Sequence, residues 1–277
     1  MTYSQFGPVE ALRVGRFPNR INTTCHLYRI GTTLIDTGPR NQWRKVWRFL
    51  KERPIERVLL THHHEDHGGN AGLIEKKCQA PVFAEERGLA PLTRGFPLPF
   101  YRRVVWGKPK RLKQARILPE RVEMEDGFSL LTLHSPGHAA DMVSFLEPER
   151  GWLFCGDLYI SSNPKYLRAD EDPNLEIESL KKVLAQSFDT VFCAHRGRLE
   201  NGRESLKTKL KYLVTLREQV QHYKRVGDSL KEIRKRLMGE EEFLHWISLG
   251  EFSKQNYIRA FAAQIREDDR PTHEELW

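Results

Sequence analysis

The sequence has few cysteines and no long apolar run. No stretch of its 277 residues approaches the roughly 20 consecutive apolar residues that span a bilayer. The N-terminus, Met1 to Gln5, lacks the basic start and apolar stretch that are typical of a secretory signal. The four cysteines, Cys25, Cys78, Cys155 and Cys193, are widely separated, which argues against a disulfide scaffold. Together these features favour a cytoplasmic protein with no membrane partner.

The composition is that of an ordinary globular chain. Hydrophobic residues make up 39% and charged residues 30%. The net charge is +8, and much of it lies in three stretches, at 40–57, 102–121 and 207–236. Such charge attracts nucleic acid or anionic substrates, but it also occurs on solvated helix faces, and both interpretations stay open.

Short apolar runs alternate with amphipathic segments along the first two hundred residues. The runs predict strands at 25–30, 32–35, 58–60, 81–84, 128–134, 142–147, 152–155 and 191–194. Apolar residues at three- and four-residue spacing predict helices at 41–52, 70–78 and 174–186. This order predicts an α/β body.

Two regions differ from this body in composition or in the spacing of their apolar residues. Residues 87–121 combine four prolines with aromatic and basic side chains, which predicts an inserted flap over a site. From 203 onward the pattern is helical, with helices expected at 203–223, 229–238 and 252–266. We therefore expect a catalytic domain at 1–202 and a C-terminal helical extension at 203–277. The sequence does not decide whether this extension closes over a substrate, forms a homodimer or caps the fold.

The run Thr61-His62-His63-His64-Glu65-Asp66-His67 is the strongest chemical signal. A strand that enters a turn aims alternate side chains the same way, which places His62 beside His64, with Asp66 and His67 following on the turn. Imidazole and carboxylate groups together suit zinc and other divalent metals. The other interpretation of the run alone is a solvated polar loop.

Three later residues of ligand type each follow an apolar strand. They are His138 in Ser135-Pro136-Gly137-His138, Asp157 after Phe154-Cys155-Gly156, and His195 after Val191 to Ala194. Loops at one edge of a sheet commonly build a site in this way. Their shared placement favours a metal centre over isolated surface residues.

These residues together resemble the metallo-β-lactamase-fold hydrolases, in particular the glyoxalase II-like branch. The motif is His62-x-His64-x-Asp66-His67 followed by His138, Asp157 and His195, with Asp36 in an early Asp-Thr-Gly turn. The resemblance covers roughly residues 10 to 200. It is highly specific for the fold and the metal site and only weakly informative about the substrate.

The resemblance implies a four-layer αββα sandwich with two divalent metal ions, zinc first and manganese or iron as alternatives. His62, His64 and His138 would hold one metal; Asp66, His67 and His195 would hold the other. Asp157 would bridge the two metals, and Asp36 would support the metal-binding turn without binding metal. His63 and Glu65 are expected to point the other way. One departure from the family is Arg196, which places a cation next to His195.

The implied activity is hydrolysis of a small-molecule ester, thioester or lactone by a metal-bridged hydroxide. Asp66 would orient the nucleophile and carry its proton. Tyr159, Tyr166 and Arg196 are the candidate substrate-binding residues. The alternatives are a metal-dependent nuclease or phosphodiesterase of the same fold, which would bind nucleic acid, and a redox role like that of the diiron members. The intact His67 argues against the redox role.

Overall fold

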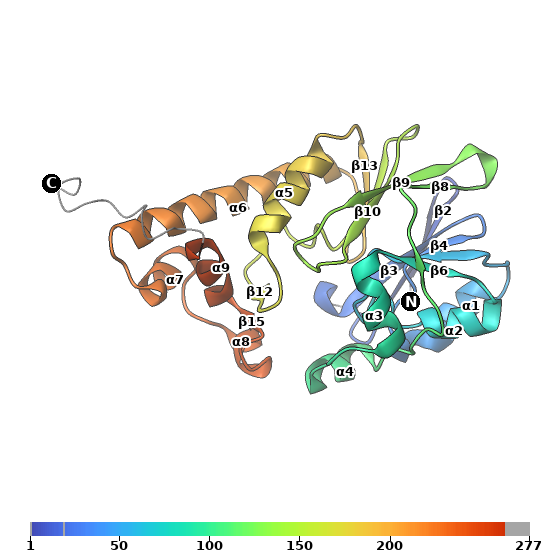
Figure 1. Cartoon of the computed structure of the whole chain (residues 1–277), viewed down its shortest axis with the longest axis horizontal. Coiled ribbons are helices and arrows are strands. Elements are labelled where there is room, and N and C mark those ends of the chain that lie inside the picture. The colour runs from blue at the N-terminus through green and yellow to red at the C-terminus, as the bar shows by residue number, and fades with distance from the viewer. Residues whose placement is uncertain (1, 19, 264–277) are drawn as a thin grey trace.

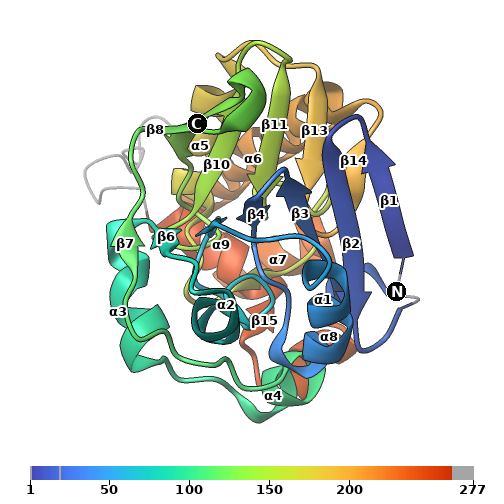
Figure 2. The ribbon, with the colours of Figure 1, turned by 90° about the vertical axis from the view of Figure 1, so that its right-hand side faces the viewer.

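The computed structural model describes residues 2–18 and 20–263. Two large β-sheets stack face to face, and helices cover their outer faces (Figures 1 and 2). Within the described residues, no helix combines the length and the apolar character that crossing a bilayer requires.

The first sheet has seven strands in chain order: β1 (Thr2–Phe6), β2 (Val9–Gly15), β3 (Thr24–Ile30), β4 (Thr33–Ile35), β5 (Arg57–Leu59), β6 (Val82–Ala84) and β7 (Arg116–Ile117). The pairs from β1 to β4 are antiparallel, whereas those from β4 to β7 are parallel. Helices α1 (Trp43–Leu50) and α2 (Ala71–Cys78) pack on its outer face through side chains such as Val46 and Ile74.

The second sheet has six strands, in the order β14 (Gly197–Leu199), β13 (Thr190–Cys193), β11 (Trp152–Gly156), β10 (Val143–Glu147), β9 (Ser129–His134) and β8 (Arg121–Glu123). Helices α5 (Pro173–Leu184) and α6 (Gly202–Arg225) cover its outer face. The inner faces of the two sheets share an aromatic core, in which the rings of Phe154 and Phe192 stack with centroids 4.6 Å apart. The predicted four-layer αββα sandwich with C-terminal helices is confirmed.

The remaining elements lie beside this sandwich. Helices α3 (Glu86–Arg94) and α4 (Phe100–Trp106) occupy the expected flap region, and α7 (Leu230–Met238), α8 (Phe243–Ile247) and α9 (Lys254–Ala262) follow α6. A small sheet pairs β12 (Leu167–Arg168) with β15 (Phe252–Ser253) and ties the C-terminal helices to the loop that follows β11. Short 3-10 helices lie at Ile21–Thr23, Arg40–Gln42 and Glu125–Gly127.

Most predicted elements are present, with differences at their ends. The expected helix at 229–238 begins at Leu230, after a capping box formed by Ser229 and Glu232. The last helix begins at Lys254 rather than 252, and residues 264–266 of that prediction lie outside the described residues. The elements that were not predicted are helix α8 and strands β1, β2, β7, β8, β12, β14 and β15. β1 is exposed along most of its length, so it lacks the alternation that marks a half-buried strand.

Candidate metal centre

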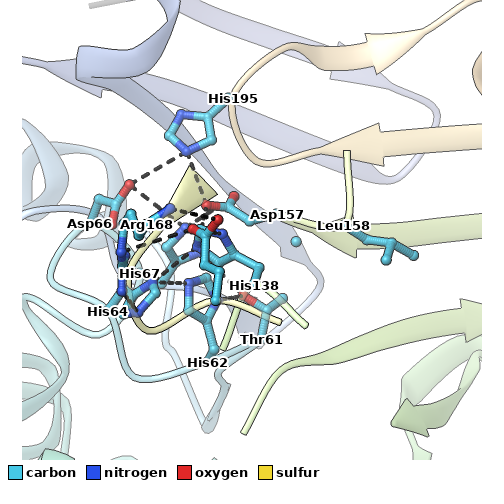
Figure 3. Close-up of polar contacts among 12 residues, drawn as sticks. Thr61, His62, His64, Asp66, His67, His138, Asp157, Leu158, Arg168 and His195 are labelled. Atoms are coloured by element: carbon cyan, nitrogen blue, oxygen red, sulfur yellow. Dashed lines mark hydrogen bonds and ion pairs between the residues drawn. The ribbon is translucent and has the colours of Figure 1, made fainter. Parts of the chain in front are cut away.

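The strand ends of both sheets meet at one edge of the sandwich. The loop from Thr61 to His67 follows β5, Asp157 follows β11, and His195 follows β13. His138 lies in the turn between β9 and β10, where Gly137 has a φ of 142° and packs so closely on Glu176 that a Cβ would not fit. Figure 3 shows their side chains converging from these four loops.

The first group contains three imidazoles: His62, His64 and His138. The Nε2 atom of His62 lies 2.8 Å from Nδ1 of His64, which lies 3.1 Å from Nε2 of His138. His62 and His64 are buried, and His138 is largely so. Three ring nitrogens that face one another in this way form a ligand set suited to a divalent cation.

The second group contains two carboxylates and two imidazoles: Asp66, His67, Asp157 and His195. The Oδ2 atom of Asp66 lies 3.5 Å from Nε2 of His195 and 3.7 Å from Nε2 of His67. All four side chains are buried. This group is richer in negative charge than the first.

Asp157 faces both groups. Its Oδ2 atom lies 3.3 Å from Nε2 of His138 in the first group and 3.2 Å from Nε2 of His195 in the second. Its Oδ1 atom lies 3.3 Å from Nε2 of His67. One carboxylate thus joins the two sets of ligands, which is the position that a bridging ligand requires.

Two buried polar atoms of the centre lack a hydrogen bond within the described residues. They are Nε2 of His67 and Oδ1 of Asp157, which lie close together without hydrogen-bond geometry. An unsatisfied buried polar atom is costly, and a coordinated cation would satisfy both of these atoms. The residues present therefore fit a metal.

The electrostatics of the two groups differ. Burial lowers the pKa values of His62 and His64 well below the ordinary range, so both rings are neutral. Burial acts in the same direction on His195, but the Asp157 carboxylate outweighs it and raises the pKa of His195 to about 10. Without a cation, the second group therefore keeps protons on its imidazoles, and a metal would displace them.

The second ring nitrogen of each ligand-type histidine also has a partner. Asp36 Oδ2 lies 2.8 Å from Nδ1 of His67, and Glu171 Oε1 lies 2.9 Å from Nδ1 of His138. The remaining contacts are Thr61 Oγ1 to His62 Nδ1 (3.1 Å), Thr24 O to His195 Nδ1 (2.7 Å) and Arg168 Nη2 to His64 Nε2 (3.1 Å). Such contacts fix the orientation of the rings.

Asp36 holds the metal-binding loop from a left-handed backbone position, with a φ of 60°. Its Oδ1 accepts the backbone N–H of Thr61 at 2.8 Å. Of the other partners, Glu171 and Arg168 were not identified from the sequence. They lie in the charged run Arg168-Ala169-Asp170-Glu171, where no motif separates them from surface residues.

His63 and Glu65 point away from the centre, as expected. The Nδ1 atom of His63 lies 2.8 Å from Asp141 Oδ1. Glu65 accepts two hydrogen bonds of 2.6 Å from the Arg102 guanidinium of α4. Arg102 also lies 3.2 Å from Glu251, so this basic side chain of the flap region is paired with acidic residues of the protein itself.

The flap region reaches both sides of the metal-binding loop. The Trp106 ring centroid lies 6.4 Å from that of His195, and Phe96 meets His63 edge to face at 4.9 Å. Trp106 is buried and Phe96 is partly so. These contacts place α4 next to the second group of ligands.

The three substrate-binding candidates contact other parts of the chain. The Tyr159 hydroxyl lies 2.9 Å from Ser162 Oγ, and the exposed Arg196 donates from Nε to the carbonyl of Ile160. The Tyr166 ring lies against the C-terminal segment, with its centroid 5.8 Å from the Lys254 ammonium. Burial and the neighbouring Glu242 raise the pKa of Tyr166 to about 12. Their role in substrate binding stays a prediction.

Comparison with known proteins identifies the family. The pattern of the family described as the metallo-beta-lactamase superfamily matches residues 22–195, which is more than half of the chain. This chain belongs to the metallo-beta-lactamase superfamily. The resemblance predicted from the histidine-rich run is thereby confirmed.

Relatives with curated names share part of the chain. It is 32% identical over 163 residues to a hydroxyacylglutathione hydrolase of Hahella chejuensis, a match that covers 57% of this chain and 55% of the relative. It is 29% identical over 185 residues to an atrochrysone carboxyl ACP thioesterase of Passalora fulva, covering 63% and 49%. The chain thus spans about half the length of these relatives. The first match supports the glyoxalase II-like branch.

A solved structure shares the fold over almost the whole chain. It is a metallo-beta-lactamase family protein of Thermus thermophilus, with a TM-score of 0.66 and 21% identity. The match covers 93% of this chain and 92% of that one. At this identity the likeness establishes the fold alone.

Proposed function

We propose that this protein hydrolyses a small-molecule thioester at a dinuclear metal centre, with esters and lactones as chemically related substrates. The observation that carries the proposal is Asp157, whose Oδ2 lies within 3.3 Å of a ring nitrogen in each ligand group. A single carboxylate between two ligand sets supports two cations rather than one.

His62, His64 and His138 would hold the first cation, and Asp66, His67 and His195 the second, with Asp157 between them. Imidazole and carboxylate ligands suit zinc, which we propose first, and manganese or iron also accept them. When bound, such a pair lowers the pKa of water and polarises a carbonyl oxygen.

Side chains around the metal centre would orient the attacking water and limit the access of bulk water. Asp66 is the most exposed of the four residues in its group, with 7% of its surface accessible. Its carboxylate would orient the attacking water and hold the proton that this water loses. Trp106, buried beside His195, would exclude bulk water from that side.

The proposed substrate class is supported by the names of two relatives and by the positive charge of Arg196. One relative is named for hydrolysis of an acylglutathione and another as a thioesterase acting with an ACP. Both names describe an acyl group on a carrier thiol. Arg196, exposed and next to His195 in the chain, would attract an acidic group of such a substrate. Tyr159 and Tyr166 stay candidates for contacts farther from the metals.

We also propose the cytoplasm as the location. All four cysteines are free, and three of them are buried. Free thiols are characteristic of proteins in a reducing compartment such as the cytoplasm.

The proposal is tested by metal content and by hydrolysis of a panel of thioesters, esters, lactones and phosphodiesters. The purified protein should carry about two equivalents of a transition metal, zinc foremost. Asp66→Asn should lower thioester hydrolysis by about 10²–10⁴-fold because the general base is lost, and His138→Ala should lose both activity and metal. His134→Ala is the matched control, because this histidine side chain is 60% exposed.

Two results would contradict the proposal: less than one bound metal in protein purified without chelator, or full thioester activity in both Asp66→Asn and His138→Ala. The alternative is a metal-dependent nuclease or phosphodiesterase, which the net charge of +8 favours. Cleavage of an oligonucleotide by the same metal-loaded protein, with no turnover of thioesters, would establish that alternative.

A further inference from the structure

A cavity of about 630 Å³ lies outside the metal centre, between α2 and the segment 110–116. This segment runs from α4 to β7 across the outside of α2 (Figure 2). The backbone of Lys110 donates to the Gly69 carbonyl, and the carbonyl of Arg111 lies so close to Gly72 that no Cβ fits between them. The segment that forms the wall of the cavity therefore packs tightly against α2.

The lining of this cavity is strongly basic. Its lining residues include one acidic residue, Glu75, and five basic ones, Lys76, Lys110, Arg111, Lys113 and Arg116. The Arg111 backbone carbonyl lies beside Gly72, whereas its guanidinium packs against Gly95 of a second cavity. The Glu75 carboxylate holds this wall in place, because its two oxygens accept the backbone N–H groups of Lys113 and Gln114 at 2.7 and 2.9 Å. Among the residues that the structure describes, no carboxylate lies within 4.0 Å of any of these five cations.

The basic lining residues outnumber the acidic one, so their charges repel one another, and a multiply charged anion would relieve this repulsion. Arginine and lysine together match phosphate groups well. No aromatic residue lines the cavity, so it lacks the stacking surface on which single-stranded nucleic acids bind. Its volume lies in the range of small-molecule sites. These properties favour a small molecule with several phosphate groups.

A second, smaller cavity lies between this one and the metal-binding loop. It has a volume of about 50 Å³ and shares Lys110 and Arg111 with the first cavity. Its lining extends through Lys108 and Arg103 to His63. The ring centroid of His63 lies 4.9 Å from that of His64, a member of the first ligand group. The second cavity therefore reaches the metal-binding loop at His63, on the side that faces away from the ligand atoms.

We propose that this basic cavity binds the phosphate groups of a small, multiply phosphorylated molecule. Such groups occur on the nucleotide part of a coenzyme A thioester and also on a separate regulatory ligand. The assignment of the phosphates to a coenzyme A thioester rests on the thioester hydrolysis proposed above, whereas phosphate binding by the cavity does not depend on it. Phosphate recognition and hydrolysis can therefore be tested separately.

Binding is measured by calorimetry with pyrophosphate and with coenzyme A on the metal-loaded protein. Both should bind saturably, and their affinity should fall as salt is added. The variant Lys110→Ala/Lys113→Ala should weaken both by about tenfold or more, the typical loss when charged hydrogen-bond donors are removed. These side chains are exposed, so the fold should be retained. The matched control is Lys211→Ala/Lys231→Ala, which removes two exposed lysines of the C-terminal helices and should leave binding unchanged.

Three results would overturn the proposal. One is the absence of saturable binding of either probe. Another is binding that survives in Lys110→Ala/Lys113→Ala and disappears in His138→Ala, since this would place the phosphates at the metals. The third is binding confined to oligonucleotides, with an affinity that rises with their length, as on a nucleic-acid surface.

Steady-state kinetics then identify the source of the phosphates. If they belong to the substrate, Lys110→Ala/Lys113→Ala raises KM for an acyl coenzyme A about tenfold and leaves kcat unchanged, because only binding contacts are lost. KM for an acylglutathione, which has no phosphate, then stays the same. If KM is unchanged for both while pyrophosphate binding is lost, the cavity serves a separate ligand.

Discussion

At the residue scale, the centre depends on side chains that would not themselves touch metal. Glu171 is the clearest case, since its carboxylate lies 2.9 Å from Nδ1 of His138, the only member of the first group that comes from outside the Thr61–His67 loop. Arg168 lies 3.9 Å from the same carboxylate and contacts His64. These two residues therefore connect His138 to His64 behind the ligand atoms.

Replacing Glu171 should weaken the metal site without removing a ligand. We expect Glu171→Leu to lower metal affinity about 10- to 100-fold, the usual effect of losing a partner of a metal-binding histidine. Glu171→Gln keeps an acceptor oxygen for His138 and should have a smaller effect. Competition with a chromophoric chelator measures the affinity, and the exposed Glu178→Gln is the control. Unchanged affinity in Glu171→Leu would show that His138 needs no such partner.

The sequence predicted the seven ligand-type residues and Asp36, which holds the loop, but not the other residues that orient the histidines. His62, His64, Asp66 and His67 lie within six positions, and the other three each follow an apolar strand, so local pattern alone indicates them. Thr24 contacts His195 through its backbone carbonyl, which no side-chain pattern reveals. Arg168 lies in β12, which pairs with β15 across about 85 residues of chain, and Glu171 follows it; a local pattern does not reveal a contact of this range.

At the element scale, α4 is joined to the metal-binding loop by a buried ion pair. Glu65 is fully buried and Arg102 is 9% exposed. The flap region was predicted from its prolines and aromatic residues, but that pattern does not show which basic residue faces inward. Arg102 and Arg103 are neighbours in the chain, yet Arg102 is buried and Arg103 is exposed.

Removing Arg102 should destabilise the protein strongly. Arg102→Ala leaves the Glu65 carboxylate buried without its partner, which typically costs about 3–5 kcal/mol in the free energy of unfolding. The double variant Glu65→Leu/Arg102→Leu removes both charges and should recover much of this loss. Urea unfolding measures both, with the exposed Arg94→Ala as control. A loss below about 1 kcal/mol in Arg102→Ala would mean that water reaches Glu65, as at a surface ion pair.

At the scale of the whole molecule, the C-terminal helices share a core with the sandwich. Leu206 and Leu213 of α6 belong to the same buried cluster as Leu180 of α5 and Val191 of β13. Ile258 and Phe261 of α9 lie in it too. Residues on both sides of the predicted boundary near residue 202 thus contribute to one buried cluster, and the division into two domains stays a prediction. The spacing of apolar residues after 203 predicts helices, but it does not show which surface of the sandwich those helices cover.

This shared core predicts that residues 2–263 unfold as one cooperative unit. Leu213→Ala removes a fully buried side chain and should lower the free energy of unfolding by about 2–5 kcal/mol. Leu249→Ala makes the same chemical change at a side chain that is 96% exposed, so it should change stability by no more than about 0.5 kcal/mol. If the core is shared, Leu213→Ala shifts a single transition, and hydrogen exchange in α6 and in β11 reports the same loss. If residues 203–277 instead form an independent domain, exchange in α6 rises while β11 keeps its original protection.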